Sequence, residues 1–89
     1  MKTDDICAHY VGESVGIVLR LLQDEDDEKV LTVLVEGRDS ALRMLGELLL
    51  AVSEGGSGQS FYMSPFGPGN AHFNKKSELG IYIHRLEGN

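Results

Sequence analysis

The sequence predicts a small α+β domain in which one helix packs on a four-stranded antiparallel sheet. Residues 41–52 place apolar side chains at helical spacing, which is typical of a helix with one buried face. Two stretches of alternating side chains precede this helix and two follow it, giving the order ββαββ. A length of 89 residues fits a single domain, 1–89.

The two strands before the helix are expected at residues 15–22 and 30–36, where apolar side chains recur with a period of two. The polar stretch of residues 23–29 connects them, which favours an antiparallel hairpin with a solvated tip. One face of this hairpin is expected to meet the helix. That face carries Val15, Ile17, Leu19, Leu21, Leu31, Val33 and Val35.

The helix is expected to begin at Asp39 or Ser40, either of which can accept a free backbone N–H as N-cap. Gly55 and Gly56 end it. Its apolar stripe contains Ala41, Leu42, Leu45, Leu48, Leu49 and Val52.

The last two strands are expected at residues 59–64 and 78–86, separated by a loop of residues 65–77. Residues 1–13 alternate weakly, and either add a fifth strand at the sheet edge or form an unpaired arm.

One helix covers only one face of such a sheet, so a second copy of the chain is expected to cover the other face in a homodimer. The dimer-face candidates are Val18, Leu34, Tyr62, Tyr82 and His84.

The chain is acidic, with a formal net charge of −6 and an isoelectric point near 4.8. This charge argues against nucleic acid and anionic membranes as partners, because both attract basic surfaces. The densest charge is the acidic run, which consists of Asp24, Glu25, Asp26, Asp27 and Glu28. It is interpreted either as a docking patch for a basic protein or as a solvated hairpin tip.

Three large side chains stand out in the turn-rich loop of residues 64–73: Phe66, His72 and Phe73. They are candidate anchors for a protein partner, since exposed aromatic side chains often dominate binding energy. The equal alternative is that they fold back and close the open end of the core.

No catalytic or metal-binding pattern emerges from the sequence. Cys7 is the only cysteine, and its spacing to His9 matches no familiar zinc motif. We therefore expect no enzyme activity, no metal and no cofactor; a pocket formed by His72, Tyr82 and His84 is the enzyme or ligand-binding alternative. The N-terminal segment has acids where a signal peptide needs an apolar run, and no stretch is long enough to span a membrane, so a cytoplasmic location is expected.

The stretch VLVEG at residues 33–37, the leucine-rich helix that follows, the break at residues 54–56 and the closing strand of residues 79–86 resemble the immunity protein 32 family of bacterial polymorphic toxin systems. This resemblance covers residues 30–86 as a pattern of elements and includes neither the acidic run nor the loop around Phe66. It implies an inhibitor that binds and neutralises a cognate toxin and has no catalytic residues. A structural or regulatory homodimer remains the alternative function.

Overall fold

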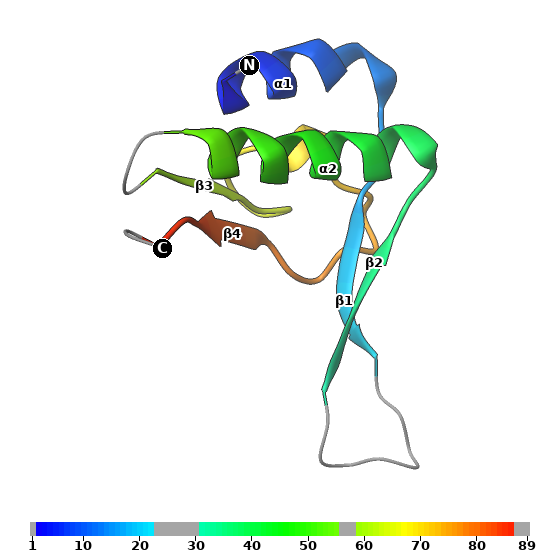
Figure 1. The fold of residues 1–89 in the computed structure, drawn as a ribbon. Helices are drawn as coiled ribbons and strands as arrows, with labels where there is room; N and C mark the ends of the chain where they lie inside the picture. Colours follow the sequence, from blue (N-terminus) through cyan, green and yellow to red (C-terminus); the bar gives the residue numbers. More distant parts are fainter. Residues whose placement is uncertain (1, 23–30, 56–58, 87–89) are drawn as a thin grey trace.

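The computed structural model describes residues 2–22, 31–55 and 59–86. The elements follow the order α1 (Thr3–Tyr10), the 3-10 turn η1 (Val11–Glu13), β1 (Val18–Leu22), β2 (Thr32–Glu36), α2 (Asp39–Glu54), β3 (Ser60–Met63), the 3-10 turn η2 (Asn70–His72) and β4 (Ile81–His84). Figure 1 shows α2 between α1 on one side and the β3–β4 pair on the other, while β1 and β2 project from one end of this body. The α+β class is confirmed.

The N-terminal segment forms the helix α1, so both earlier expectations for residues 1–13, an edge strand or an arm, are wrong. Asp4 and Asp5 lie in its first turn, where carboxylates interact favourably with the helix dipole. Ile6 and Tyr10 are its buried residues, and their spacing of four places both on one helical face. The Tyr10 hydroxyl donates a hydrogen bond to the Glu47 carboxylate, which ties α1 to α2.

The helix α2 forms where the sequence predicts it, from Asp39 to Glu54, with Gly55 directly after it. Arg38 occupies the N-cap position, so the expectation that Asp39 or Ser40 caps the helix is wrong. The Asp39 carboxylate instead accepts a hydrogen bond from the Ser40 N–H at 2.9 Å. Two members of the expected stripe, Leu42 and Leu49, are exposed, because the buried face is rotated toward α1 and the β3–β4 pair. The buried residues of α2 are Ala41, Met44, Leu45, Leu48, Ala51 and Val52.

The single four-stranded sheet is wrong, because the described strands form two separate antiparallel pairs. In one pair β1 lies beside β2 with Arg20 opposite Leu34, and in the other β3 lies beside β4 with Tyr62 opposite Tyr82. Each expected strand exists but is shorter at one or both ends than its alternating stretch.

The two sheets stay apart because an irregular segment occupies the edge of β1 that another strand would need. The Ile17 N–H donates to the His72 carbonyl, and the Asn74 N–H donates to the Ile17 carbonyl. Further along, the Leu19 N–H donates to the Ser77 hydroxyl, while the N–H groups of residues 78 and 79 both donate to the Leu19 carbonyl. The long loop therefore occupies the edge of β1 to which a third strand of a single sheet would have to bond.

The core gathers side chains from both helices, from the first part of β1 and from β3. Its central members include Ile6, Ile17, Met44, Leu48 and Met63, each at most 2% exposed. Phe61, Ile81 and Ile83 pack against it from the inner face of the β3–β4 pair.

Candidate protein-binding surface

The hairpin of β1 and β2 presents an uncovered apolar face, which we call the hairpin face and define as Leu21, Val33 and Val35. The pairs Leu19–Val35 and Leu21–Val33 stand side by side on this face. Leu19 is buried at the base of the hairpin, whereas Val33 is 54% and Val35 is 47% exposed. Figure 1 shows why: α2 lies over the body and leaves most of the hairpin uncovered. The helix-facing side expected from the sequence is thus buried only from Val15 to Leu19.

The hydrogen bonds of Leu19 also fix which backbone groups of β2 face outward. Because the N–H and carbonyl of Leu19 bond to residues 77–79, they point away from β2. In an antiparallel ladder the residue opposite such a position also points its polar groups away from the shared edge, and the pattern alternates along the strand. Val33 and Val35 therefore direct their N–H and C=O groups to the outer edge of β2.

The acidic run of Asp24, Glu25, Asp26, Asp27 and Glu28 lies outside the described residues. In the sequence it falls between the last residue of β1, Leu22, and the first residue of β2, Thr32. The part of the chain with the highest charge density is therefore continuous with the two strands that carry the hairpin face.

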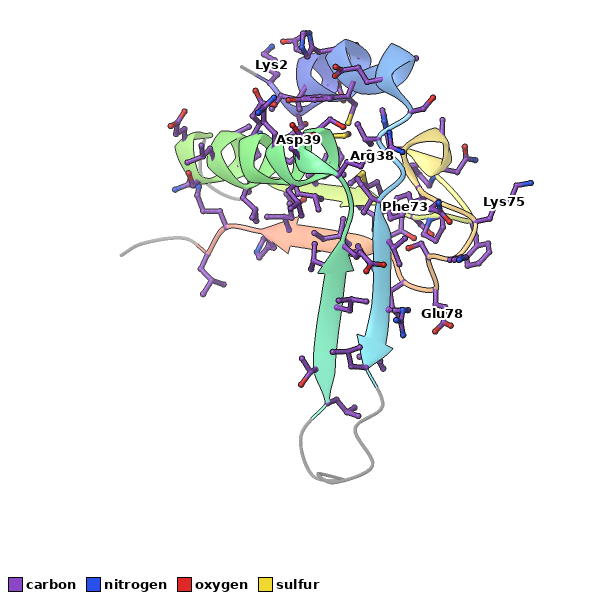
Figure 2. All side chains as sticks on the ribbon, turned by 90° about the vertical axis from the view of Figure 1, so that its right-hand side faces the viewer. Lys2, Arg38, Asp39, Phe73, Lys75 and Glu78 are labelled. Atoms are coloured by element: carbon purple, nitrogen blue, oxygen red, sulfur yellow. The ribbon has the colours of Figure 1, made fainter. Side chains whose placement is uncertain are left out.

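The three loop candidates occupy different environments. Phe66 is 84% exposed, and a tight turn presents it: the Phe66 N–H donates to the Ser64 hydroxyl, and the Ser64 N–H donates to the Pro68 carbonyl. Phe73 is half-buried against the core and lies beside β1 in Figure 2. His72 is only 4% exposed. Phe66 alone of the three is well placed to anchor a partner. His72 and Phe73 instead pack toward the core, as the alternative interpretation of the loop expects.

Burial also governs the protonation of His72. Its backbone carbonyl accepts a hydrogen bond from Ile17, which holds the ring at the junction of β1 and the loop. Removal from water disfavours the charged imidazolium and lowers the pKa of His72 below its ordinary value of 6.5. The ring is therefore predominantly neutral at pH 7.

The dimer-face candidates divide between the two sheets. Tyr62, Tyr82 and His84 share the outer face of the β3–β4 pair, with ring centroids 6.2 Å apart for the two tyrosines and 6.4 Å apart for Tyr82 and His84. Tyr82 is 65% exposed, so this aromatic cluster is open to solvent. Val18 and Leu34 belong to the other sheet, where Val18 is buried and Leu34 is half-buried. They do not form one continuous face with the aromatic cluster.

Among the described residues, Cys7 and the three candidate pocket residues His72, Tyr82 and His84 lie in different environments. Burial, and secondarily the neighbouring Asp4 carboxylate, raise the pKa of Cys7, which disfavours the nucleophilic thiolate. His72 is buried while Tyr82 and His84 lie on the exposed face of β4, so the three do not share one environment. Among the described residues, no group of three or more His, Cys, Asp or Glu side chains is arranged to hold a metal ion.

A polar depression at the base of the hairpin is the feature that the sequence did not suggest. It is lined by Gly16, Glu36, Arg38, Asn74 and Lys76 among others. Figure 2 places Arg38 at the junction of β2 and α2. Glu36 and Arg38 lie two residues apart in the sequence, whereas Gly16 and Lys76 come from distant segments that only the fold brings beside them.

No protein-family model, no curated protein and no solved structure matches the chain significantly. In the described part of the chain, no helix is both long enough and apolar enough to cross a membrane.

Proposed function

We propose that this chain is an acidic protein-binding module that acts as an immunity-type inhibitor, binding and neutralising a cognate toxin. The observation that carries the proposal is the projecting hairpin, whose apolar face remains uncovered while its two strands are joined in sequence by the acidic run. Apolar side chains supply binding energy when buried against a partner, and carboxylates steer a basic partner into place. The class of partner, a toxin, is taken from the resemblance to the immunity protein 32 family.

The hairpin is suited to recognition because it stands clear of the body. Its base is fixed through Leu19, and Figure 1 shows the rest of β1 and β2 projecting beyond the helices. A partner can therefore approach both strands without displacing α1 or α2. Phe66 provides a second, separate contact point on the loop.

The test is capture of a basic protein from the native bacterial host at low salt, followed by measurement of affinity for the isolated partner. Reversing the five acids to lysine should weaken binding strongly and remove its salt dependence, because screening acts on the same charges. Co-expression with the partner should protect cells from its toxicity. Unchanged binding and unchanged salt dependence after charge reversal would contradict the inhibitor proposal.

A homodimer without catalytic activity is the second candidate function. It is favoured by the aromatic cluster of Tyr62, Tyr82 and His84, which lies open on the outer face of the β3–β4 pair. Loss of self-association in a Tyr82→Ala variant would support pairing through that cluster. A monomer at all accessible concentrations would exclude the dimer.

A further inference from the structure

The outer edge of β2 is the feature from which a specific partner can be inferred. Within the described segments, no backbone hydrogen bond joins this edge to another part of the chain. The strand reads TVLVE, contains no proline or lysine, and carries no bulge in its pairing with β1. Edge strands of soluble proteins are normally protected by such features, because an open edge pairs readily with another strand.

The hairpin also lacks the packing that a two-stranded ribbon needs. An isolated pair of strands is only marginally stable in water, and a third strand or a covering helix is required for independent stability. Within residues 2–22, 31–55 and 59–86, the part of this hairpin beyond Leu19 has neither a third strand nor a covering helix. A strand added to β2 would supply the missing neighbour.

We propose that a second copy of this chain occupies the edge, so that β2 pairs antiparallel with β2 of the partner about a two-fold axis at Leu34. In this register Leu34 faces its own copy, Val33 faces Val35 of the other chain, and Thr32 faces Glu36. The product is a four-stranded sheet in the order β1-β2-β2-β1. This pairing rests on the homodimer alternative but gives it a surface other than the cluster of Tyr62, Tyr82 and His84, and it does not depend on toxin binding.

The backbone pattern of β2 fits this register. Val33 and Val35 point their N–H and C=O groups outward, and the register places these two residues opposite each other in both symmetry-related positions. Each such pair therefore exchanges both of its hydrogen bonds. Leu34 directs its backbone N–H and C=O groups to β1 and lies on the two-fold axis. It faces its own copy there as a non-hydrogen-bonded pair, which needs no backbone bond between the two residues. Registers centred on Val33 or Val35 would also set outward-pointing residues against each other, but only the register at Leu34 pairs all five residues of β2.

The side chains agree with the same register. On one face, Val33 and Val35 of each chain meet, so the two hairpin faces join into one apolar surface with Leu19 and Leu21. On the other face, the only charged residue of β2, Glu36, meets a threonine hydroxyl that can donate to its carboxylate. Parallel pairing in register would instead place two Glu36 carboxylates side by side. Charge complementarity therefore selects the antiparallel arrangement.

A five-residue edge is short compared with standard interfaces, which bury roughly 1,200–2,000 Å². The dimer should therefore be reversible and appear in the micromolar range rather than persist at nanomolar concentration. Its driving force is backbone pairing between two chains that each carry a net charge of −6. Added salt should leave the dimer's affinity unchanged or raise it, whereas added salt should lower the affinity for a basic toxin.

The experiment is sedimentation velocity of the full chain over a range of concentrations, with three kinds of variant. Leu34→Glu should preserve the pairing of β1 with β2 inside each monomer, because Arg20 lies opposite residue 34 and attracts the new carboxylate. In the dimer, however, it places two carboxylates against each other on the two-fold axis. We expect it to weaken dimerisation at least about tenfold. Leu22→Glu is the matched control, since it adds the same charge on the same face of β1, away from the edge. It should dimerise like the wild type.

Val33→Pro tests the backbone directly, because it removes an N–H that faces outward and is not used in the ladder with β1. It should lose dimerisation and keep the circular dichroism of the monomer. The register is tested by mixing a Val33→Glu, Val35→Glu double variant with a Val33→Lys, Val35→Lys double variant. Each should be monomeric alone, and the mixture should form a heterodimer.

Three results would overturn the proposal. A wild-type chain that stays monomeric at hundreds of micromolar, on the order expected to populate weak complexes, has no self-pairing edge. If the dimer survives Leu34→Glu but is lost in Tyr82→Ala, the chain is a homodimer that does not pair through β2. Protection of the β2 amides from hydrogen exchange only when a different protein is bound would assign the edge to that protein.

Discussion

Ser77 gives the sharpest test of how the hairpin is held to the body. Its side chain is only 3% exposed and bonds to both backbone groups of Leu19: it accepts from the N–H at 2.9 Å and donates to the carbonyl at 3.2 Å. Ser77→Ala removes both bonds, together with the hydroxyl's longer contact to the Leu79 carbonyl at 3.3 Å, while leaving a side chain of similar size. The consequences for the two groups differ.

The Leu19 carbonyl keeps two donors, the N–H groups of Glu78 and Leu79, each at 3.0 Å. The Leu19 N–H keeps none among the described residues and remains buried. The expected loss is therefore that of one buried, unsatisfied donor, which costs about 1–3 kcal/mol in the free energy of unfolding. For a domain of this size, a loss of about 2 kcal/mol lowers Tm by roughly 8–16 °C.

Urea denaturation followed by circular dichroism measures the change, with an unchanged m-value showing that the same surface is exposed. Ser53→Ala is the control, because the Ser53 hydroxyl is exposed and bonds only to the Leu50 carbonyl within α2. It should change stability by less than about 0.5 kcal/mol. If Ser77→Ala were equally neutral, the attachment of β1 described here would be wrong.

Three further predictions concern His72, two glycines and Phe66. Because burial lowers the pKa of His72, the unfolded chain binds the proton more tightly; the stability due to the neutral ring is complete above pH 6.5 and declines as the pH falls from there toward the folded-state pKa. Urea titrations at several pH values should show this decline in the wild type and a flatter profile in His72→Gln; identical profiles would contradict the buried neutral ring. Gly46→Ala should raise the free energy of unfolding by about 0.5–1 kcal/mol, since no atom lies within 4 Å of the added Cβ in mid-helix. Gly80→Ala should lower it by about 1–3 kcal/mol, because its Cβ would lie 2.7 Å from the Met63 carbonyl oxygen; equal signs for the two variants in thermal unfolding would refute the packing. Phe66→Ala should leave Tm unchanged and weaken toxin binding by about 2 kcal/mol in calorimetry, and a fall in Tm would show that Phe66 is part of the core.

The local elements were predictable because their signals are local. Helix α2 has an apolar stripe over four turns and a glycine after it, and the four strands and the β1–β2 hairpin follow from alternation. The helix α1 was missed because Ile6 and Tyr10 fit both a helical face and a weak strand alternation over so short a segment. Only the tertiary contact with α2 decides between them.

The arrangement of the strands was not predictable from periodicity. The edge of β1 is occupied by loop residues, and their pairing with Leu19 depends on the Ser77 side chain. A contact of this kind produces no alternation of apolar and polar residues in the sequence. As a result, the face of Leu21, Val33 and Val35 was expected in the core and is exposed instead. Of the loop candidates, Phe66 is exposed and His72 is buried, a difference set by the turn at Ser64 and by packing beside β1.

We propose that a toxin binds this chain through the β1–β2 hairpin. Hydrogen exchange of the chain alone and in complex with the captured toxin tests it most directly, at a concentration where the free chain is monomeric. We expect the amides of residues 18–36 to gain the strongest protection, while the amides of β3 and β4 do not change. Protection centred on Tyr62 and Tyr82, with the hairpin unaffected, would contradict it.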